Sequence, residues 1–72
     1  GSAESVVLVL EGDVLAKAVE IRDSLIAQGY RVRLENRPKK LNGLLESMAA
    51  NGFTHFATLD ESTTEIELRP IS

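Results

Sequence analysis

The 72-residue sequence has no cysteine, only one histidine, and few aromatic side chains. Without cysteine, neither a disulfide framework nor a cysteine metal site can form, and the single histidine leaves metal binding to carboxylates. No apolar run approaches the roughly 18 residues that would cross a bilayer, and no charged-then-apolar leader opens the chain. We therefore expect a soluble, cytoplasmic domain with no membrane partner, no bound metal and no structural zinc.

The common catalytic motifs are also missing. The sequence contains no Walker loop and no GxGxxG, HExxH or GxSxG pattern, which removes the commonest enzyme classes. His55 would need a nucleophile within hydrogen-bond reach to act as a base, and Ser47 and Ser62 are the serines nearest to it in the sequence. A lone histidine on a strand is more often structural, so the isolated domain is expected to be non-catalytic and free of cofactors.

The first half of the chain changes its hydrophobic period twice. Val6 to Leu10 is an uninterrupted apolar run, which suits a strand buried on both faces. Gly12 and Asp13 introduce a helical pattern that closes at Gly29, with Asp13 as the expected N-cap. Tyr30 to Glu35 alternates strictly between apolar and charged residues, which predicts a strand at the edge of a sheet.

The second half predicts one helix and two strands. Pro38 is expected to open the helix at its first turn, and Asn51-Gly52 to end it. Phe53 to Leu59 follows as a third strand. After a polar turn at residues 60–63, the alternation from Glu65 to Arg69 predicts a half-buried fourth strand, antiparallel to the third.

These elements predict an α/β fold in a single small domain with the order βαβαββ. Right-handed crossovers give a mixed four-stranded sheet of order 2-1-3-4, with the two helices on opposite faces. The domain covers residues 3–72, and Gly1-Ser2 resembles the remnant of an expression tag. One helix per face cannot cover four strands, so Ile66, Leu68 and Phe56 are expected to expose apolar area. That surface predicts a homodimer through the side of the fourth strand.

Positive charge is concentrated in one stretch although the net charge is -3. Five of the eight basic residues lie between positions 31 and 40: Arg31, Arg33, Arg37, Lys39 and Lys40. Such a cluster can be an electrostatic footprint for nucleic acid. It can equally be a charged edge strand that prevents pairing between sheets, and the sequence leaves both interpretations open.

Short features of the second half also carry a family resemblance. Glu35 to Arg37 form an acidic-x-Arg sequence, Pro38 to Leu41 a basic helix start, and Ala49 to Gly52 an alanine-rich turn into glycine. A strand and an acidic turn follow at Phe56 to Glu61. In this combination the chain resembles the C-terminal anticodon-binding domain of class IIa aminoacyl-tRNA synthetases, nearest to the histidyl type. The family's final strand and closing helix have no counterpart here.

The resemblance implies a non-catalytic module that recognises a tRNA anticodon stem-loop, within a parent protein that is an aminoacyl-tRNA ligase. In such a module, splayed bases are read by stacking and by hydrogen bonds to their edges. Arg33, Arg37, Lys39 and Lys40 would neutralise phosphate, and Glu35 and Glu61 would accept hydrogen bonds from base edges. Tyr30, Phe53 and Phe56 have the spacing of core residues. The alternative is a protein-interaction or dimerisation domain of a synthetase-like paralogue.

A third interpretation rests on acids that follow the first and third strands. Glu11, Asp13 and Asp60 would gather at the carboxyl edge of a parallel sheet, where they could bind Mg²⁺ as in response-regulator receiver domains. The opening VVLVLEGD resembles that family as well, but the further βα units and the usual lysine strand are missing. Helix capping by Asp13 and turn formation by Asp60 are the simpler explanations.

Overall fold

The apolar run near the N-terminus forms the central strand, β1 (Ser5–Leu10), of the sheet in the computed structural model, which describes residues 4–72. Gly1 and Ser2 lie outside the described residues. All six β1 residues are buried, and alternate side chains enter two separate cores. Val6, Leu8 and Leu10 belong to one core, and Val7 and Val9 to the other. The predicted burial of this strand on both faces is therefore confirmed.

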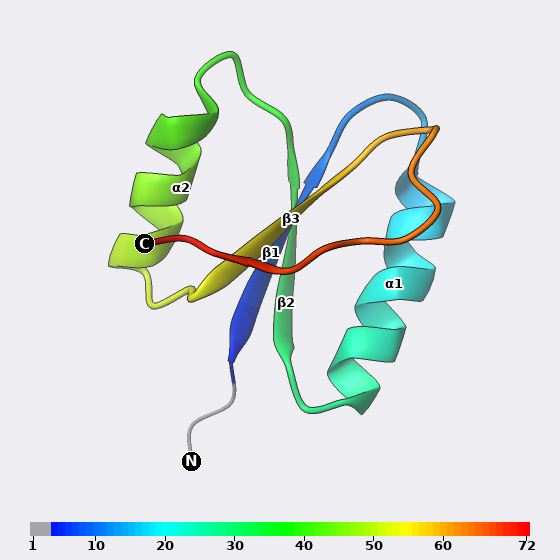
Figure 1. The fold of residues 1–72 in the computed structure, drawn as a ribbon, viewed down its shortest axis with the longest axis horizontal. Helices are drawn as coiled ribbons and strands as arrows, with labels where there is room; N and C mark the ends of the chain where they lie inside the picture. Colours follow the sequence, from blue (N-terminus) through cyan, green and yellow to red (C-terminus); the bar gives the residue numbers. More distant parts are fainter. Residues whose placement is uncertain (1–3) are drawn as a thin grey trace.

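Two helices cover opposite faces of the sheet (Figure 1). Helix α1 (Leu15–Ala27) contributes Ala18 and Leu25 to the core built on Leu8, which we call the α1-side core. Helix α2 (Leu41–Ala50) contributes Met48 to the core built on Val7, the α2-side core. None of the helices in the described part of the chain is long and apolar enough to cross a membrane.

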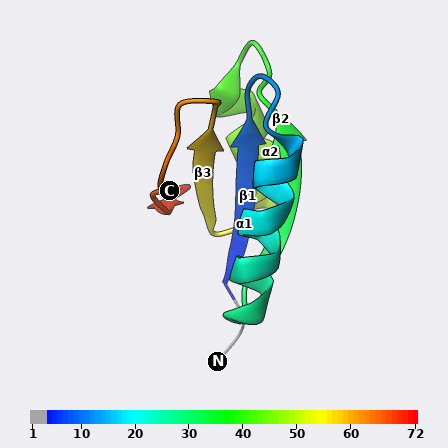
Figure 2. The same cartoon turned by 90° about the vertical axis from the view of Figure 1, so that its right-hand side faces the viewer.

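The remaining strands complete the predicted sheet. β2 (Arg31–Asn36) and β3 (His55–Leu59) pair parallel with the two sides of β1, and β4 (Arg69–Pro70) pairs antiparallel with β3. The order β2-β1-β3-β4, the element order βαβαββ and the edge position of β2 are as predicted from the sequence. Figure 2 shows the C-terminal segment beyond β3, at the edge opposite β2.

The starts of both helices differ from the prediction. Asp13 is not the N-cap of α1, because Val14 occupies that position without a side-chain capping bond. The backbone N–H of Asp13 instead donates to Glu61 Oε1 at 3.1 Å, so the loop after β1 is held by the turn after β3. Pro38 does not open α2, whose N-cap is Lys40. The chain stays extended beyond β2, since the Arg37 N–H still donates to the Leu10 carbonyl at 2.7 Å.

The fourth strand is shorter than the alternation from Glu65 to Arg69 predicts, because only Arg69 and Pro70 pair with β3. Ile66 and Leu68 turn inward and pack, half-buried, against the α1-side core. Ile71 then packs against the α2-side core, and its N–H donates to the Thr54 carbonyl at 3.0 Å. The segment thus passes the β3 edge from one face to the other and covers apolar surface that was expected to be open. Phe56 is likewise half-buried in the α2-side core.

Candidate nucleic-acid interface

Strand β2 presents its charged side chains on the α2 side of the sheet. In the parallel register with β1, Arg31 is the partner of Ser5, Arg33 of Val7 and Glu35 of Val9. Partners in neighbouring strands project from the same face, and Val7 and Val9 belong to the α2-side core. Val32 and Leu34 project to the other face and pack against the α1-side core.

On its α2 side, β2 adds no residue to the apolar core. The residues of the α2-side core come from β1, α2, Phe53, Phe56 and Ile71, and β2 contributes none. Arg33, with 55% of its side chain exposed, forms an ion pair with the 27% exposed Glu35, in which Nε lies 2.6 Å from Oε2. Two of the predicted contacts to RNA are therefore bonded to each other. An exposed ion pair of this kind contributes little to stability.

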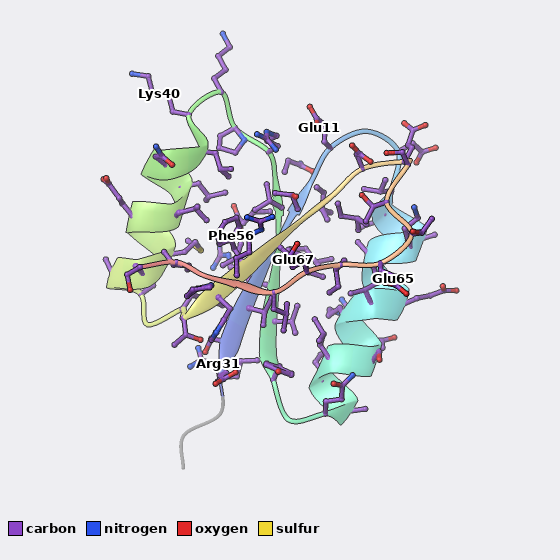
Figure 3. All side chains as sticks on the ribbon, in the orientation of Figure 1. Glu11, Arg31, Lys40, Phe56, Glu65 and Glu67 are labelled. Atoms are coloured by element: carbon purple, nitrogen blue, oxygen red, sulfur yellow. The ribbon has the colours of Figure 1, made fainter. Side chains whose placement is uncertain are left out.

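The loop between β2 and α2 gathers the other basic residues. Arg37, Lys39 and Lys40 are exposed and line one surface hollow of about 530 Å³ together with the first residues of α2. Figure 3 shows Lys40 at the start of that helix. None of the three forms an ion pair with residues 4–72. Because the N-terminal turn of a helix also carries free N–H groups and a partial positive charge, this end of the domain favours an anion.

Glu61, the remaining predicted contact, lies outside this hollow. It belongs to the turn after β3, where its Oε1 accepts the Asp13 N–H. Gly12 lies against the same oxygen with φ at +82°, and a Cβ atom there would come within 2.6 Å of it. The positive φ favours glycine at position 12, a side chain there would displace the Glu61 carboxylate, and Glu61 joins two loops. The structure brings Arg37, Lys39 and Lys40 together but leaves Glu61 apart from them.

Arg31 has a contact that the sequence does not reveal. Its guanidinium carbon lies 5.7 Å from the centroid of the Phe53 ring, within the range of a cation–π interaction. Arg31 is the first basic residue in the alternating pattern of β2, and that pattern predicts the face of the sheet from which its side chain projects. The identity of its aromatic neighbour depends on how the turn after α2 returns to the sheet.

The carboxyl edge of the sheet holds Asp60 in a hydrogen-bonded turn. Its Oδ1 accepts bonds from the Ser62 hydroxyl (2.7 Å), the Ser62 N–H (2.9 Å) and the Thr63 hydroxyl (3.1 Å). These bonds lower the pKa of the Asp60 carboxyl, and the bond from the Ser62 side chain has the largest effect. Residues 4–72 contain no group of three or more His, Asp or Glu side chains that could hold a metal. The magnesium site that requires Glu11, Asp13 and Asp60 to converge is therefore not formed among them.

His55 lies near the other end of the sheet, in a structural setting. Its Nδ1 is 2.8 Å from the Thr54 hydroxyl, and Glu4 Oε2 is 4.0 Å away. The same hydroxyl donates to the Ser5 carbonyl and accepts the Ser5 N–H, both at 3.1 Å. Within the described residues neither Ser47 nor Ser62 is a hydrogen-bond partner of this histidine. The contacts join β1 to the start of β3.

Comparison with curated proteins finds similarity to a histidine–tRNA ligase. The histidine–tRNA ligase of Leifsonia xyli subsp. xyli is 38% identical over an alignment of 72 positions, which covers 96% of this chain. The chain is homologous to part of a histidine–tRNA ligase. The resemblance to histidyl-type synthetases found in the sequence is thereby confirmed. The chain spans 17% of the length of that ligase, a share consistent with one domain. No protein-family model and no solved structure matches the chain.

Proposed function

We propose that this chain is a non-catalytic module that recognises the tRNA anticodon in a histidyl-type synthetase or a close relative. The observation that carries the proposal is the hollow shared by Arg37, Lys39 and Lys40, three exposed cations without an ion-pair partner in residues 4–72. Homology to part of a histidine–tRNA ligase supports the choice of tRNA over other polyanions. Aminoacylation would be the task of parts of the parent protein outside this chain.

The residues divide into two roles in this proposal. Arg37, Lys39 and Lys40 contact phosphates, because a guanidinium or an ammonium at a helix N-terminus complements a phosphate in charge and hydrogen bonding. Glu35 offers carboxylate oxygens to the edges of unstacked bases, as carboxylates do for amino groups. Glu61, the other acid that the sequence suggested, holds the loop after β1 and is left out of this proposal. Arg33 orients Glu35 through their 2.6 Å contact and adds positive charge beside it.

The salt dependence of RNA binding tests the proposal. The anticodon stem-loop of histidine tRNA is titrated with the protein at several KCl concentrations, and fluorescence anisotropy reports the affinity. Arg37→Ala and Lys40→Ala are each expected to weaken binding and to reduce the slope of log K against log[salt] by about 0.7 to 0.9, the change for one lost phosphate contact. Arg69→Ala is the matched control, because Arg69 is an exposed cation on β4, at the opposite edge of the sheet. Absence of RNA binding at low salt, or unchanged binding by the double variant, would exclude the role for this chain.

A protein-interaction module is the second candidate, and one observation favours it. Leu15 and Ile26 of α1 are 62% and 51% exposed, the two large apolar side chains most open to water in the described residues. Their separation along the helix brings them to the same face, three turns apart. Loss of a partner on substitution of Leu15 and Ile26, with no RNA binding by the unsubstituted chain, would favour this candidate over the first.

A further inference from the structure

Arg31 is an exposed guanidinium held in place by a ring. It lies over Phe53, at 5.7 Å from the ring centroid, and forms no ion pair within residues 4–72. Phe53 is itself half-buried and packs against the α2-side core, so the ring is fixed by its neighbours. Arg31 is nevertheless exposed, so its guanidinium is accessible to a ligand as well as to the ring. A guanidinium is planar and suited to stacking on a base.

Few other surfaces of the domain can stack on a base. The chain has one tyrosine and two phenylalanines and lacks tryptophan. Tyr30 packs against the α1-side core and Phe56 against the α2-side core, where both are half-buried. Recognition of unpaired RNA relies on stacking against aromatic rings or arginine planes. The Arg31–Phe53 pair therefore supplies an element that the basic hollow at the start of α2 lacks.

The position of Arg31 defines a path along β2. At about 3.3 Å per residue, Arg31 and Arg37 lie about 20 Å apart along the chain, with Arg33 between them on the same side. Figure 3 shows Arg31 and Lys40 at opposite ends of this side of the molecule. A polyanion laid along the strand would meet basic side chains at both ends of this path and Arg33 between them.

Acidic side chains lie at two points of this path, and at its far end Glu11 and Asp60 share a second hollow with Arg37. Glu35 is the acid that β2 presents there, and it is already paired with Arg33. Glu46, the acid of α2, lines a separate hollow with Ala49 and Ile71, on the flank of the helix that faces the C-terminus. Helical spacing carries Gly43 and Ser47 to the other flank, which has no charge.

We propose that the α2 side of β2 binds a single-stranded RNA segment, and that Arg31, resting on Phe53, is the platform on which one unpaired base stacks. The inference rests on the proposed anticodon-recognition function and extends it. Phosphate contacts at Arg37 and Lys40 supply charge, and Arg31 supplies base stacking at the far end of the same side.

Replacement of the guanidinium at constant charge tests this platform. Arg31→Lys keeps the positive charge and removes the planar group. The RNA is the anticodon stem-loop of histidine tRNA, with 2-aminopurine at single loop positions so that its fluorescence reports stacking. We expect the unsubstituted protein to change the fluorescence at one loop position. Arg31→Lys should abolish that change and weaken binding about five- to tenfold, the loss of one stacked base, without altering the salt slope.

Two further variants complete the test. Phe53→Leu removes the ring beneath the arginine and is expected to abolish the same fluorescence change, with its unfolding midpoint measured to confirm that the domain folds. Arg69→Lys, at the opposite edge of the sheet, is expected to change neither affinity nor fluorescence. If Arg37→Ala weakens binding while Arg31→Lys leaves affinity and fluorescence unchanged, the platform is wrong and the anticodon role stands. If the unsubstituted chain does not bind the stem-loop, both proposals fail.

Discussion

At the scale of single residues, the carboxyl edge of the sheet depends on side chains that bond to backbone from another loop. Glu61 accepts the Asp13 N–H, and Gly12 leaves room for that carboxylate. Asp13 has the residue type of an N-cap, yet its backbone N–H is a donor to a residue 48 positions away. Residue type alone therefore predicts the N-cap in the correct loop but at the wrong position, because the helix begins one residue later, with Val14 as its N-cap.

The carboxyl group of Asp60 is expected to make the stability of the domain depend on pH. Hydrogen bonds from Ser62 and Thr63 lower its pKa from the ordinary value of 3.8. A carboxyl whose folded pKa is depressed adds stability that is present above the unfolded pKa and is lost as the pH falls through the folded value. We expect the free energy of unfolding to decrease as the pH drops below about 4, and to decrease less in Asp60→Asn, which keeps the turn but cannot ionise.

Urea unfolding of both proteins across that range, with an NMR titration of the Asp60 carboxyl, measures the effect. Ser62→Ala is the intermediate control, since it removes the foremost of the bonds and should raise the pKa toward its ordinary value. An Asp60 carboxyl that titrates at or above the ordinary value would contradict the expectation.

At the scale of elements, the segment between β3 and β4 follows the alternation of apolar and charged residues in its burial but not in its strand pairing. Ile66 and Leu68 point inward and Glu65 and Glu67 are exposed, as a period of two requires. Figure 3 shows the two glutamates on the extended stretch that leads to β4. The alternation identified the buried side chains correctly. It did not identify the backbone partner, because an extended segment can bury alternate residues without pairing beside a strand.

Lys17 of α1 fastens this segment to the helix. Its Nζ donates to the Thr63 carbonyl at 2.7 Å and to the Asp60 and Glu61 carbonyls at 3.4 Å each. Lys17→Met keeps most of the aliphatic stem and removes the donors. We expect a loss of about 1 kcal/mol in the free energy of unfolding, because the bonds are charge-assisted but partly open to water.

Hydrogen exchange locates that effect. Amides of residues 60–68 should exchange faster in Lys17→Met, while those of β1 should exchange at nearly the original rate, since local opening does not require the core to unfold. Lys39→Met is the matched control, because Lys39 is exposed in the β2–α2 loop. Equal exchange in both variants would show that Lys17 does not fasten the segment.

At the scale of the whole molecule, charge is divided between the two edges of the sheet. Basic residues follow β2 and the start of α2, and the stretch after β3 carries Asp60, Glu61, Glu65 and Glu67. The net charge of -3 conceals this division. A polyanion would approach from the β2 edge, where the potential is favourable, and would be repelled from the β4 edge.

The same division bears on the homodimer that the sequence predicts through the side of the fourth strand. Ile66 and Leu68, the side chains on which that prediction rests, pack against the α1-side core of their own chain. A twofold interface on this side would also bring like acidic residues together. We expect the isolated chain to sediment as a monomer at micromolar concentration. A dimer that Leu68→Glu dissociates and Arg33→Glu does not would contradict this expectation and support a homodimer through the side of the fourth strand.

The sequence by itself determined the order of elements, the burial of β1 and the edge position of β2. Each follows from local pattern: an apolar run for a doubly covered strand, alternation for a half-covered one, and right-handed crossovers for the order. The relation to histidyl-type synthetases was likewise contained in short sequence features. Of the candidate site, the basic loop after β2 was sufficient to predict that Arg37, Lys39 and Lys40 lie together, whereas Arg33 is bonded to Glu35 on the strand.

The tertiary structure decided the features that depend on residues far apart in the chain. The capture of the Asp13 N–H by Glu61, the fastening of the C-terminal segment by Lys17 and the seating of Arg31 on Phe53 all join elements that are not consecutive. A sequence pattern reports which face of an element is apolar. It does not report which donor finds which acceptor, because those pairs form only after the sheet has brought the ends of its strands to a common edge.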